Sequence, residues 1–350
     1  MLSNLLLTFF ASFTFLFIFR IIGIRYSLID KPNFRKNHQG HIPLVGGVAL
    51  YGTLLIYFLV SSDAINSSTL FLISISTLIV IGVIDDKFDI SYKSRLLTQV
   101  ILSLLMINYA DLSLHYLGNI LGSSFIDLGF IAPLITIFAV IGLINAMNMV
   151  DGIDGLLGGL SFTAFASLSL LLYMKDHEQA QLCMIICVAL IPYLLMNLGL
   201  LGRQHKIFMG DAGSMMIGFS LIWILISVSQ KQQVIRPITA IWFIAIPLID
   251  MTALIIYRLQ KKRSPFKPDR EHLHHVLQRL GFTNTQALIT ILFFSVLFCA
   301  FGILGEIYNI AESIMFFSFI FCFISYFLWL QHYRHIKTLS HMSKIEKSIV

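Results

Sequence analysis

Apolar segments separated by short polar breaks make up almost the whole chain. A helix needs about 20 mostly apolar residues to cross a bilayer, and eleven segments reach or approach that length. They lie at residues 4–24, 44–61, 68–84, 92–109, 131–149, 156–174, 179–200, 213–229, 237–257, 286–305 and 312–330. This pattern predicts an all-α polytopic membrane protein with about eleven transmembrane helices. Residues 1–350 are expected to form a single integral-membrane domain.

The composition supports the same class of protein. Hydrophobic residues make up 57% of the chain and charged residues only 12%, and the mean hydropathy is +0.85. The first apolar segment lacks a basic n-region and a small-residue cleavage site. It is therefore predicted to remain as a helix rather than to be removed as a signal peptide.

The 24 Lys and Arg residues divide unequally between the two alternating sets of breaks. On one side, 21 of them lie in or beside the segments 25–43, 85–95, 201–212 and 258–285 and the tail after residue 330. The opposite loops contain only three, Lys175, Lys231 and Arg236. By the positive-inside rule, the N-terminus is expected outside and the C-terminus in the cytoplasm. Because topology accounts for the positive charge, no nucleic-acid partner is expected.

Three carboxylates follow an uncharged apolar run in the sequence "DDKFD", as Asp85, Asp86 and Asp89. Two like charges about 4 Å apart repel by roughly 4 kcal/mol at an effective dielectric constant near 20. A positive group is therefore expected beside them. The alternative is an acidic helix end that is simply solvated.

A second polar group lies in "NAMNMVDGIDG" (145–155), where Asn145, Asn148, Asp151 and Asp154 recur at every third position. Each is offset by about 60° from the one before, so together they form a slow polar spiral around a helix. Polar side chains on the inner stripe of a spanning helix usually mark a functional site. The alternative is a helix end whose Asn and Asp residues cap their own backbone.

A third acid, Asp211, lies in "FMGDAGS" (208–214), on the same predicted side as the other two groups. The glycines beside it are expected to let the backbone approach a ligand, with the amides that begin the next span free to bind an anion. Carboxylate and amide oxygens suit Mg²⁺ or Mn²⁺, and substrate phosphates with water complete such a site. The acids therefore predict a divalent cation, and the cation predicts a phosphate.

A histidine cluster lies in the basic segment 258–282, whose "REHLHH" contains Arg270, His272, His274 and His275. "HLHH" is compatible with zinc, but no cysteine lies on this side, so a role in binding a nucleotide or its diphosphate is preferred. The neighbouring lysines are expected to set topology or to contact anionic membrane lipids. A second basic element, "KPNFRKNHQGHIPLVGG" (31–47), contains His38 and His41 and is predicted to close the site.

Five pieces, "HQGHIPLVGG", "DDKFD", "NAMNMVDGIDGL", "FMGDAGS" and "HLHH", occur in this order along almost the entire chain. In these pieces the chain resembles the polyprenyl-phosphate N-acetylhexosamine-1-phosphate transferases, and more distantly the enzyme that makes the first lipid intermediate of peptidoglycan. The resemblance implies that undecaprenyl phosphate accepts a sugar 1-phosphate from a UDP-sugar and that UMP is released. It also implies Mg²⁺ or Mn²⁺ as cofactor and an active site in the loops 25–43, 85–95, 145–155, 201–214 and 258–285.

The resemblance assigns roles to the candidate residues. Asp85 and Asp86 are expected to be catalytic or associated with the metal, Asp151 and Asp154 to lie in the catalytic centre, and Asn148 and Asp211 to be metal ligands. The remaining candidates are assigned to substrate binding: Asp89, Asn145, Arg270, His272, His274, His275, His38 and His41.

The resemblance also implies a biological setting. The expected location is the bacterial inner membrane, with the active site facing the cytoplasm and the product used for cell-envelope polysaccharide such as O antigen and lipopolysaccharide. UDP-GlcNAc is the expected donor, with another UDP-N-acetylhexosamine or UDP-MurNAc-pentapeptide as alternatives. Whether the chain forms a homo-oligomer stays open.

The expected chemistry is direct displacement at the sugar-linked phosphorus, with Asp85 orienting or deprotonating the lipid phosphate and Asp86 supporting it. The alternative is a covalent aspartyl-phosphate intermediate. Two other classes of protein are less favoured, namely a magnesium-dependent prenyltransferase and a lipid-linked substrate transporter. A transporter should have charges within its spans, and Asp250 is the main example here; it is interpreted as support for a kink near Pro247.

Overall fold

Helices form nearly all of the protein. The computed structural model describes residues 2–30, 40–60, 65–264 and 271–349. The helices are α1 (Leu2–Arg25), α2 (Gly46–Val60), α3 (Ile65–Phe88), α4 (Tyr92–Ala110), α5 (Ala132–Val150), α6 (Leu156–Met174), α7 (Gln179–Asn197), α8 (Gly210–Ile226), α9 (Pro237–Phe243), α10 (Ala245–Gln260), α11 (Leu273–Arg279), α12 (Asn284–Ile307) and α13 (Glu312–Ile349). The predicted helical, multi-pass architecture is confirmed.

Four very short strands form two antiparallel pairs. One pair is β1 (Ile29–Asp30) with β2 (Ile42–Pro43), and the other is β3 (Tyr116–Gly118) with β4 (Ile126–Asp127). The first pair holds the chain between α1 and α2 close to Phe208, whose amide donates a hydrogen bond of 2.9 Å to the carbonyl of Pro43. It therefore ties the segment after α1 to the segment before α8.

In the described part of the chain, fewer helices qualify as membrane spans than the sequence pattern predicted. Within the described residues, eight helices are long and apolar enough to cross a membrane, and the pair α9 and α10, bent by 84°, makes a ninth if it counts as one span. The predicted spans at 44–61 and 92–109 correspond to α2, which has only 15 residues, and α4, which has Lys93 and Arg95 in its first turns. The predicted count of eleven is therefore not confirmed.

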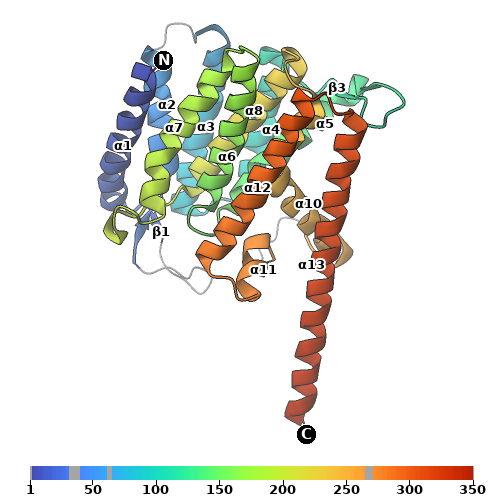
Figure 1. Cartoon of the computed structure of the whole chain (residues 1–350). Helices are drawn as coiled ribbons and strands as arrows, with labels where there is room; N and C mark the ends of the chain where they lie inside the picture. The colour runs from blue at the N-terminus through green and yellow to red at the C-terminus, as the bar shows by residue number, and fades with distance from the viewer. Residues whose placement is uncertain (1, 31–39, 61–64, 265–270, 350) are drawn as a thin grey trace.

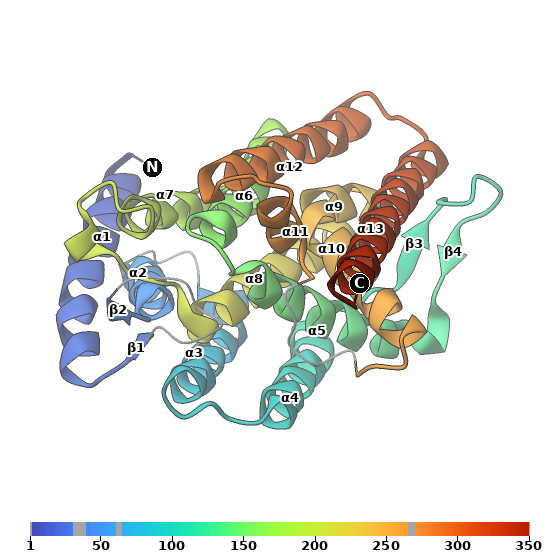
Figure 2. The same ribbon diagram turned by 90° about the horizontal axis from the view of Figure 1, so that it is seen from below.

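Helix α8 lies at the centre of the bundle, against α2, α3 and α5 (Figure 2). Its sequence has no charged residue after Asp211, and every residue from Ala212 to Ile226 is buried. A helix that is apolar on all sides is expected in a core. Close approach to α3 needs a residue without a side chain, because a Cβ on Gly82 would collide with the backbone of Ala212. This contact brings the C-terminal end of α3 beside the N-terminal end of α8.

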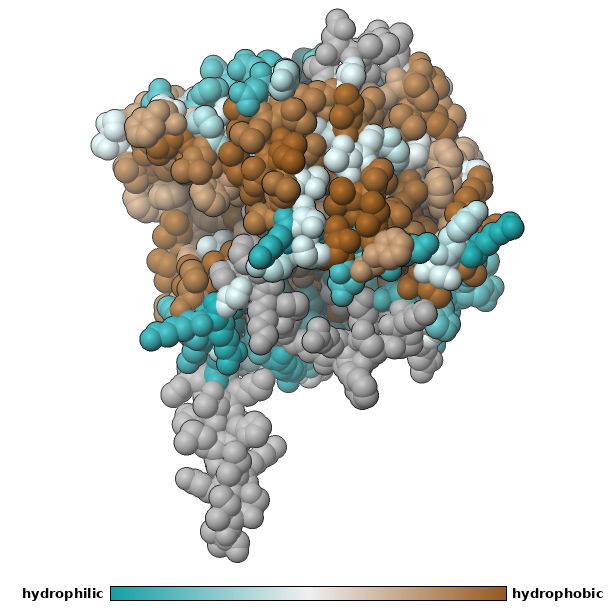
Figure 3. All heavy atoms as spheres, turned by 180° about the vertical axis from the view of Figure 1, so that it is seen from behind, coloured by the Kyte–Doolittle hydropathy of each residue, from teal (hydrophilic) through white to brown (hydrophobic). Residues whose placement is uncertain are grey.

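The two ends of the bundle differ. The chain starts at one end, and α13 finishes beyond the other, where α11 and β1 also lie (Figure 1). Brown apolar side chains cover the body of the rear face, with teal hydrophilic residues above and below them (Figure 3). The predicted acidic loops and the histidine segment meet at the end of the bundle that carries α11.

Candidate active site

A cleft of about 1280 Å³ opens at the α11 end of the bundle. Pockets for drug-sized ligands hold roughly 300–1,000 Å³, so this cleft has room for a larger ligand or for two. Nine of the residues predicted from the sequence line it: His41, Asp85, Asp86, Asp89, Asn148, Asp151, Asp154, Asp211 and His275. Segments that are far apart along the chain therefore meet at one site.

The remaining predicted residues do not line the cleft. Asn145 donates hydrogen bonds of 2.8 Å to the Gln99 side chain and to the Ile141 carbonyl. It therefore belongs to the contact between α4 and α5 and not to the cleft surface. His272 and His274 are buried beneath the cleft. His38 and Arg270 lie outside the described residues.

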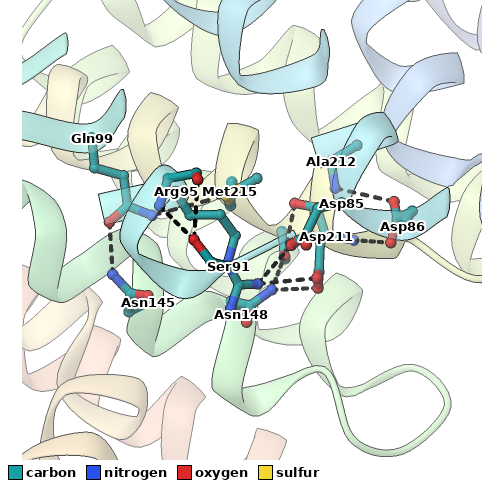
Figure 4. Close-up of polar contacts among 12 residues, drawn as sticks. Asp85, Asp86, Ser91, Arg95, Gln99, Asn145, Asn148, Asp211, Ala212 and Met215 are labelled. Carbon is teal, nitrogen blue, oxygen red and sulfur yellow. Dashed lines mark hydrogen bonds and ion pairs between the residues drawn. The ribbon is translucent and has the colours of Figure 1, made fainter. Parts of the chain in front are cut away.

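The positive group expected beside the acids is Arg95, in the first turn of α4. One of its terminal nitrogens, Nη1, lies 2.8 Å from Asp85 Oδ2 and 3.1 Å from Asp211 Oδ2 (Figure 4). Asp85 lies in the last turn of α3 and Asp211 in the first turn of α8, so the guanidinium joins two helices as well as two charges. The Asp85 side chain is only 3% exposed, whereas that of Asp211 is 37% exposed and faces the cleft.

Asn148 holds the other oxygen of Asp211. Its amide nitrogen donates to Asp211 Oδ1 at 2.7 Å and to the Ser214 hydroxyl at 2.8 Å. Asn148 lies in the last turn of α5, so this contact fixes the end of α5 against the start of α8. The two residues predicted as metal ligands are thus direct neighbours.

Asp86 has a different role from Asp85, although the two are adjacent in the sequence. Its carboxylate accepts hydrogen bonds from the backbone amides of Asp211 at 2.8 Å and Ala212 at 3.3 Å. A carboxylate at a helix N-terminus satisfies free amides and interacts favourably with the helix dipole. The amides that the sequence predicted to be free for a ligand anion are therefore taken by Asp86.

Asp151 and Asp154 lie in the turn between α5 and α6, because α5 ends at Val150. Asn197, at the end of α7, accepts from the Gly155 amide at 2.6 Å and donates to the Ile207 carbonyl at 2.8 Å. Lys206 donates to Asp154 at 2.6 Å. These contacts hold the turn against the segment that leads into Asp211.

The histidine segment turns only one of its three rings toward the cleft. His275 lines the cleft with Gln278 and Asn284, whereas the His272 ring lies 3.0 Å from Asp250 Oδ2. The other oxygen of Asp250 accepts from the Leu273 amide at 3.1 Å and from the Tyr326 hydroxyl at 2.6 Å.

The interpretation of Asp250 as support for the kink is wrong. The bend lies at Ile244, and Asp250 instead anchors the histidine segment to α10 and α13.

His274 packs between the other histidines and the acidic turn. A Cβ on Gly152 would collide with its ring, so Gly152 allows the turn to lie directly on His274. Burial, and then the neighbouring His275 and His272, lower the pKa of His274 to about 3. Its ring is therefore neutral at neutral pH, and it lies buried against the Asp151–Asp154 turn.

Comparison with known proteins identifies the family. Residues 68–229 match the profile of glycosyl transferase family 4. The chain is 46% identical over 335 residues to the undecaprenyl-phosphate alpha-N-acetylglucosaminyl 1-phosphate transferase of Haemophilus influenzae, covering 95% of this chain and 94% of that protein. The chain belongs to glycosyl transferase family 4. The resemblance seen in the five sequence pieces is confirmed.

Other relatives of the same name in glycosyl transferase family 4 match the chain over similar lengths. The Pasteurella multocida protein is 49% identical over 330 residues, covering 93% of this chain and 92% of its own length. The Escherichia coli K12 protein is 43% identical over 327 residues, covering 93% and 89% respectively. These matches extend beyond the family profile, which ends at residue 229, to most of the chain.

The residues of the cleft could supply only part of the coordination shell of a divalent cation, and water or substrate phosphate would complete it. Among the described residues, no three His, Cys, Asp or Glu side chains form a group that would hold a metal ion. Asp211 is one of the accessible carboxylates of the cleft, and Asn148 and Asp85 lie beside it. Mg²⁺ is commonly held by one or two carboxylates together with substrate phosphates and water, and these residues match that donor set.

The sequence analysis missed Arg95, Lys206 and Asn197 as site residues. Arg95 and Lys206 were counted only among the basic residues that set topology. Arg95 follows "DDKFD" within ten residues, and an Arg that close to unpaired acids was a usable signal. Asn197 lies at the end of an apolar helix and has no such signal, because its partners are both in distant segments.

Proposed function

We propose that the protein transfers GlcNAc-1-phosphate from UDP-GlcNAc to undecaprenyl phosphate and releases UMP. The observation that carries this proposal is the near full-length identity of 43–49% to relatives named for that transfer. The cleft supports it, because three groups of acids converge there with two histidines and two arginines, and a further arginine, Arg95, pairs with two of the acids. The product, a lipid diphosphate sugar, would begin cell-envelope polysaccharide synthesis.

The chemistry joins two anions, so the site must offset their repulsion. An oxygen of the lipid phosphate attacks the phosphorus that bears the sugar. The bond from that phosphorus to the UMP oxygen breaks, and UMP leaves with the electron pair. A phosphate monoester has a second pKa near 6 and is mostly dianionic at neutral pH. It therefore needs orientation more than deprotonation.

The protein residues have separate tasks in this proposal. Asp85 orients the lipid phosphate or accepts its remaining proton. Asp211 and Asn148 would hold Mg²⁺ or Mn²⁺, which when bound would neutralise charge on the diphosphate. Asp86 acts indirectly, because it fixes the backbone from which Asp211 extends. His275, Gln278 and Asn284 offer hydrogen-bonding groups to the UDP-sugar from the opposite wall.

Direct displacement and a covalent aspartyl-phosphate make different predictions. Asp86 has both carboxylate oxygens on backbone amides, which makes it a poor nucleophile. Asp85 is buried and paired with Arg95, and this pairing also lowers its reactivity. We therefore favour direct displacement. Isolation of phosphorylated protein after incubation with UDP-GlcNAc alone, without lipid acceptor, would contradict it.

The membrane arrangement is part of the proposal. Eleven spans, with α2, α4 and the bent α9 and α10 each crossing once, would place the N-terminus outside and the cleft at the cytoplasmic face of the inner membrane. The distribution of 21 and 3 basic residues and the termini at opposite ends of the bundle support this arrangement. A reporter fused after residue 350 is expected to be active only in the cytoplasm; periplasmic activity would overturn the orientation.

The donor sugar is tested with purified protein, undecaprenyl phosphate, Mg²⁺ and a panel of UDP-sugars. UMP release is measured for UDP-GlcNAc, UDP-GalNAc and UDP-MurNAc-pentapeptide. We expect the highest kcat/KM with UDP-GlcNAc. Higher kcat/KM with another donor would change the assigned sugar, and no UMP release with any of them would overturn the proposed activity.

A further inference from the structure

Arg95 occupies the space between the two carboxylates to which the proposed function assigns central roles. A single nitrogen, Nη1, is within hydrogen-bonding distance of both Asp85 and Asp211. The Arg95 side chain is 26% exposed, so solvent reaches it although it is paired with both acids. Figure 4 shows its guanidinium directed at both acids.

The other polar groups around Asp211 leave few positions for a cation. Asn148 already donates to Oδ1 of Asp211, and Arg95 donates to Oδ2. Asp86 cannot substitute, because both of its oxygens accept backbone amides. A cation that is to bind Oδ2 of Asp211 must therefore displace the Arg95 nitrogen from it.

We propose that Arg95 is an internal counter-ion of Asp85 and Asp211 that competes with the divalent cation for Asp211. This inference rests on the proposed function, which assigns these acids to the cation and the lipid phosphate. With the cation bound to Asp211, the Arg95 guanidinium would be free to contact a substrate phosphate. Arg binds phosphate oxygens well because its planar group presents paired donors. One residue would thus stabilise the acids before substrate binds and contact phosphate afterwards.

The competition has a direct test in metal binding. Mn²⁺ affinity is measured by electron paramagnetic resonance for the wild type, Arg95→Gln and Lys93→Gln, each without substrate. Lys93 is exposed on the same helix, so Lys93→Gln removes an equal charge without removing a partner of the acids. Coupling between two ligands is commonly about 5- to 150-fold, so we expect Mn²⁺ to bind at least about fivefold more tightly to Arg95→Gln. Lys93→Gln should differ little from the wild type.

The same competition is measurable in the unaltered protein, which removes any dependence on the folding of a variant. Phenylglyoxal modification of Arg95 is followed by mass spectrometry with and without Mn²⁺, and Arg203, on another wall of the cleft, is the internal reference. Released from the acids, Arg95 should react faster in Mn²⁺ while Arg203 does not change.

Either of two results would overturn the inference: Mn²⁺ affinity of Arg95→Gln no higher than that of Lys93→Gln, or no Mn²⁺-dependent rise in Arg95 modification. Both experiments measure binding and not turnover. Their outcome is therefore distinguishable from a failure of the proposed transferase activity, which the UMP assay reports separately.

Discussion

The acids around Asp211 and the histidines around Asp250 both place ionisable groups at the same end of the bundle, yet they are arranged in opposite ways. Asp211 is 37% exposed and lines the cleft, and its neighbours direct it there. Asp250 is buried, and its oxygens are used by His272, Leu273 and Tyr326. The acidic region is arranged for ligands, whereas the histidine region is mainly arranged to hold α11 in place.

The two regions differ because their side chains do not all point into the cleft. His272, His274 and His275 are close in sequence, but successive residues on a helix point about 100° apart. Only His275 therefore turns to the cleft. The acids come from separate helices, and each helix end contributes a side chain directed into the same space. A cluster assembled from distant segments is here the better indicator of a binding site than a cluster within one motif.

The largest expected effect is on turnover, from Asp211→Asn. Loss of one preorganised charged group at a reacting centre commonly lowers kcat by about 10²–10³-fold, and we expect at least the lower value. UMP release is the measurement, and Asp111→Asn, an 84% exposed acid at the far end of α4, is the matched control. Near-normal turnover in Asp211→Asn would remove this residue from the catalytic set.

Asp250→Asn is expected to act on stability instead. The amide keeps one acceptor but loses the charge that His272, Leu273 and Tyr326 share, and a buried group left unsatisfied costs about 1–3 kcal/mol. Thermal unfolding of the purified protein should show a lower Tm, while kcat with saturating UDP-GlcNAc stays within about fivefold of the wild type. A large loss of kcat at unchanged Tm would instead make Asp250 part of the reacting centre.

The variants His275→Gln and His274→Gln compare a cleft-lining and a buried histidine of the same motif. His275 faces the cleft, so its replacement is expected to raise KM for UDP-GlcNAc about tenfold, the equivalent of one lost hydrogen bond of about 1.4 kcal/mol. His274→Gln should change KM less and Tm more. The opposite pattern would show that the buried ring, and not the exposed one, contacts the donor.

The smallest expected effect is a pH dependence of stability that comes from His274. Its pKa is lowered from 6.5 to about 3 in the folded protein, so the unfolded chain binds a proton that the folded one does not. The stabilisation is complete above pH 6.5 and is lost as the pH falls toward 3. Between pH 6.5 and 5.5 the loss is about 1 kcal/mol. His274→Gln should show a correspondingly smaller fall in Tm; an identical fall would exclude His274 as its source.

Much of the fold was predictable because its signal is local. The apolar run at 213–229 predicted a span, and α8 occupies it, although its central, fully buried position was not predicted. The limits came from α2 and α4, which are short or begin with charges, and from α9 and α10, where one apolar run contains an 84° bend. Hydropathy gives the length of a segment but not the direction of its axis.

The site was predictable as a set of loops but not as a set of contacts. The convergence of Asp85, Asn148 and Asp211 on one cleft was predictable because acids and amides are unusual at the ends of apolar helices. The distinct contacts of Asp85 and Asp86 were not predicted. They depend on which of two adjacent side chains meets the α8 amides, and that is decided by the close packing of Gly82 on Ala212. The pairing of Arg95 with Asp85 lies within ten residues, but its second partner, Asp211, is 116 residues away and was not predictable.

The most direct test of the central claim is the acceptor dependence of UMP release. Purified protein is given UDP-GlcNAc and Mg²⁺ with and without undecaprenyl phosphate, and UMP and lipid-linked sugar are quantified together. If the cleft aligns two substrates for direct transfer, UMP should form only when the lipid is present, with one sugar on lipid for each UMP. UMP formed without the lipid, or without matching lipid-linked sugar, would contradict the account.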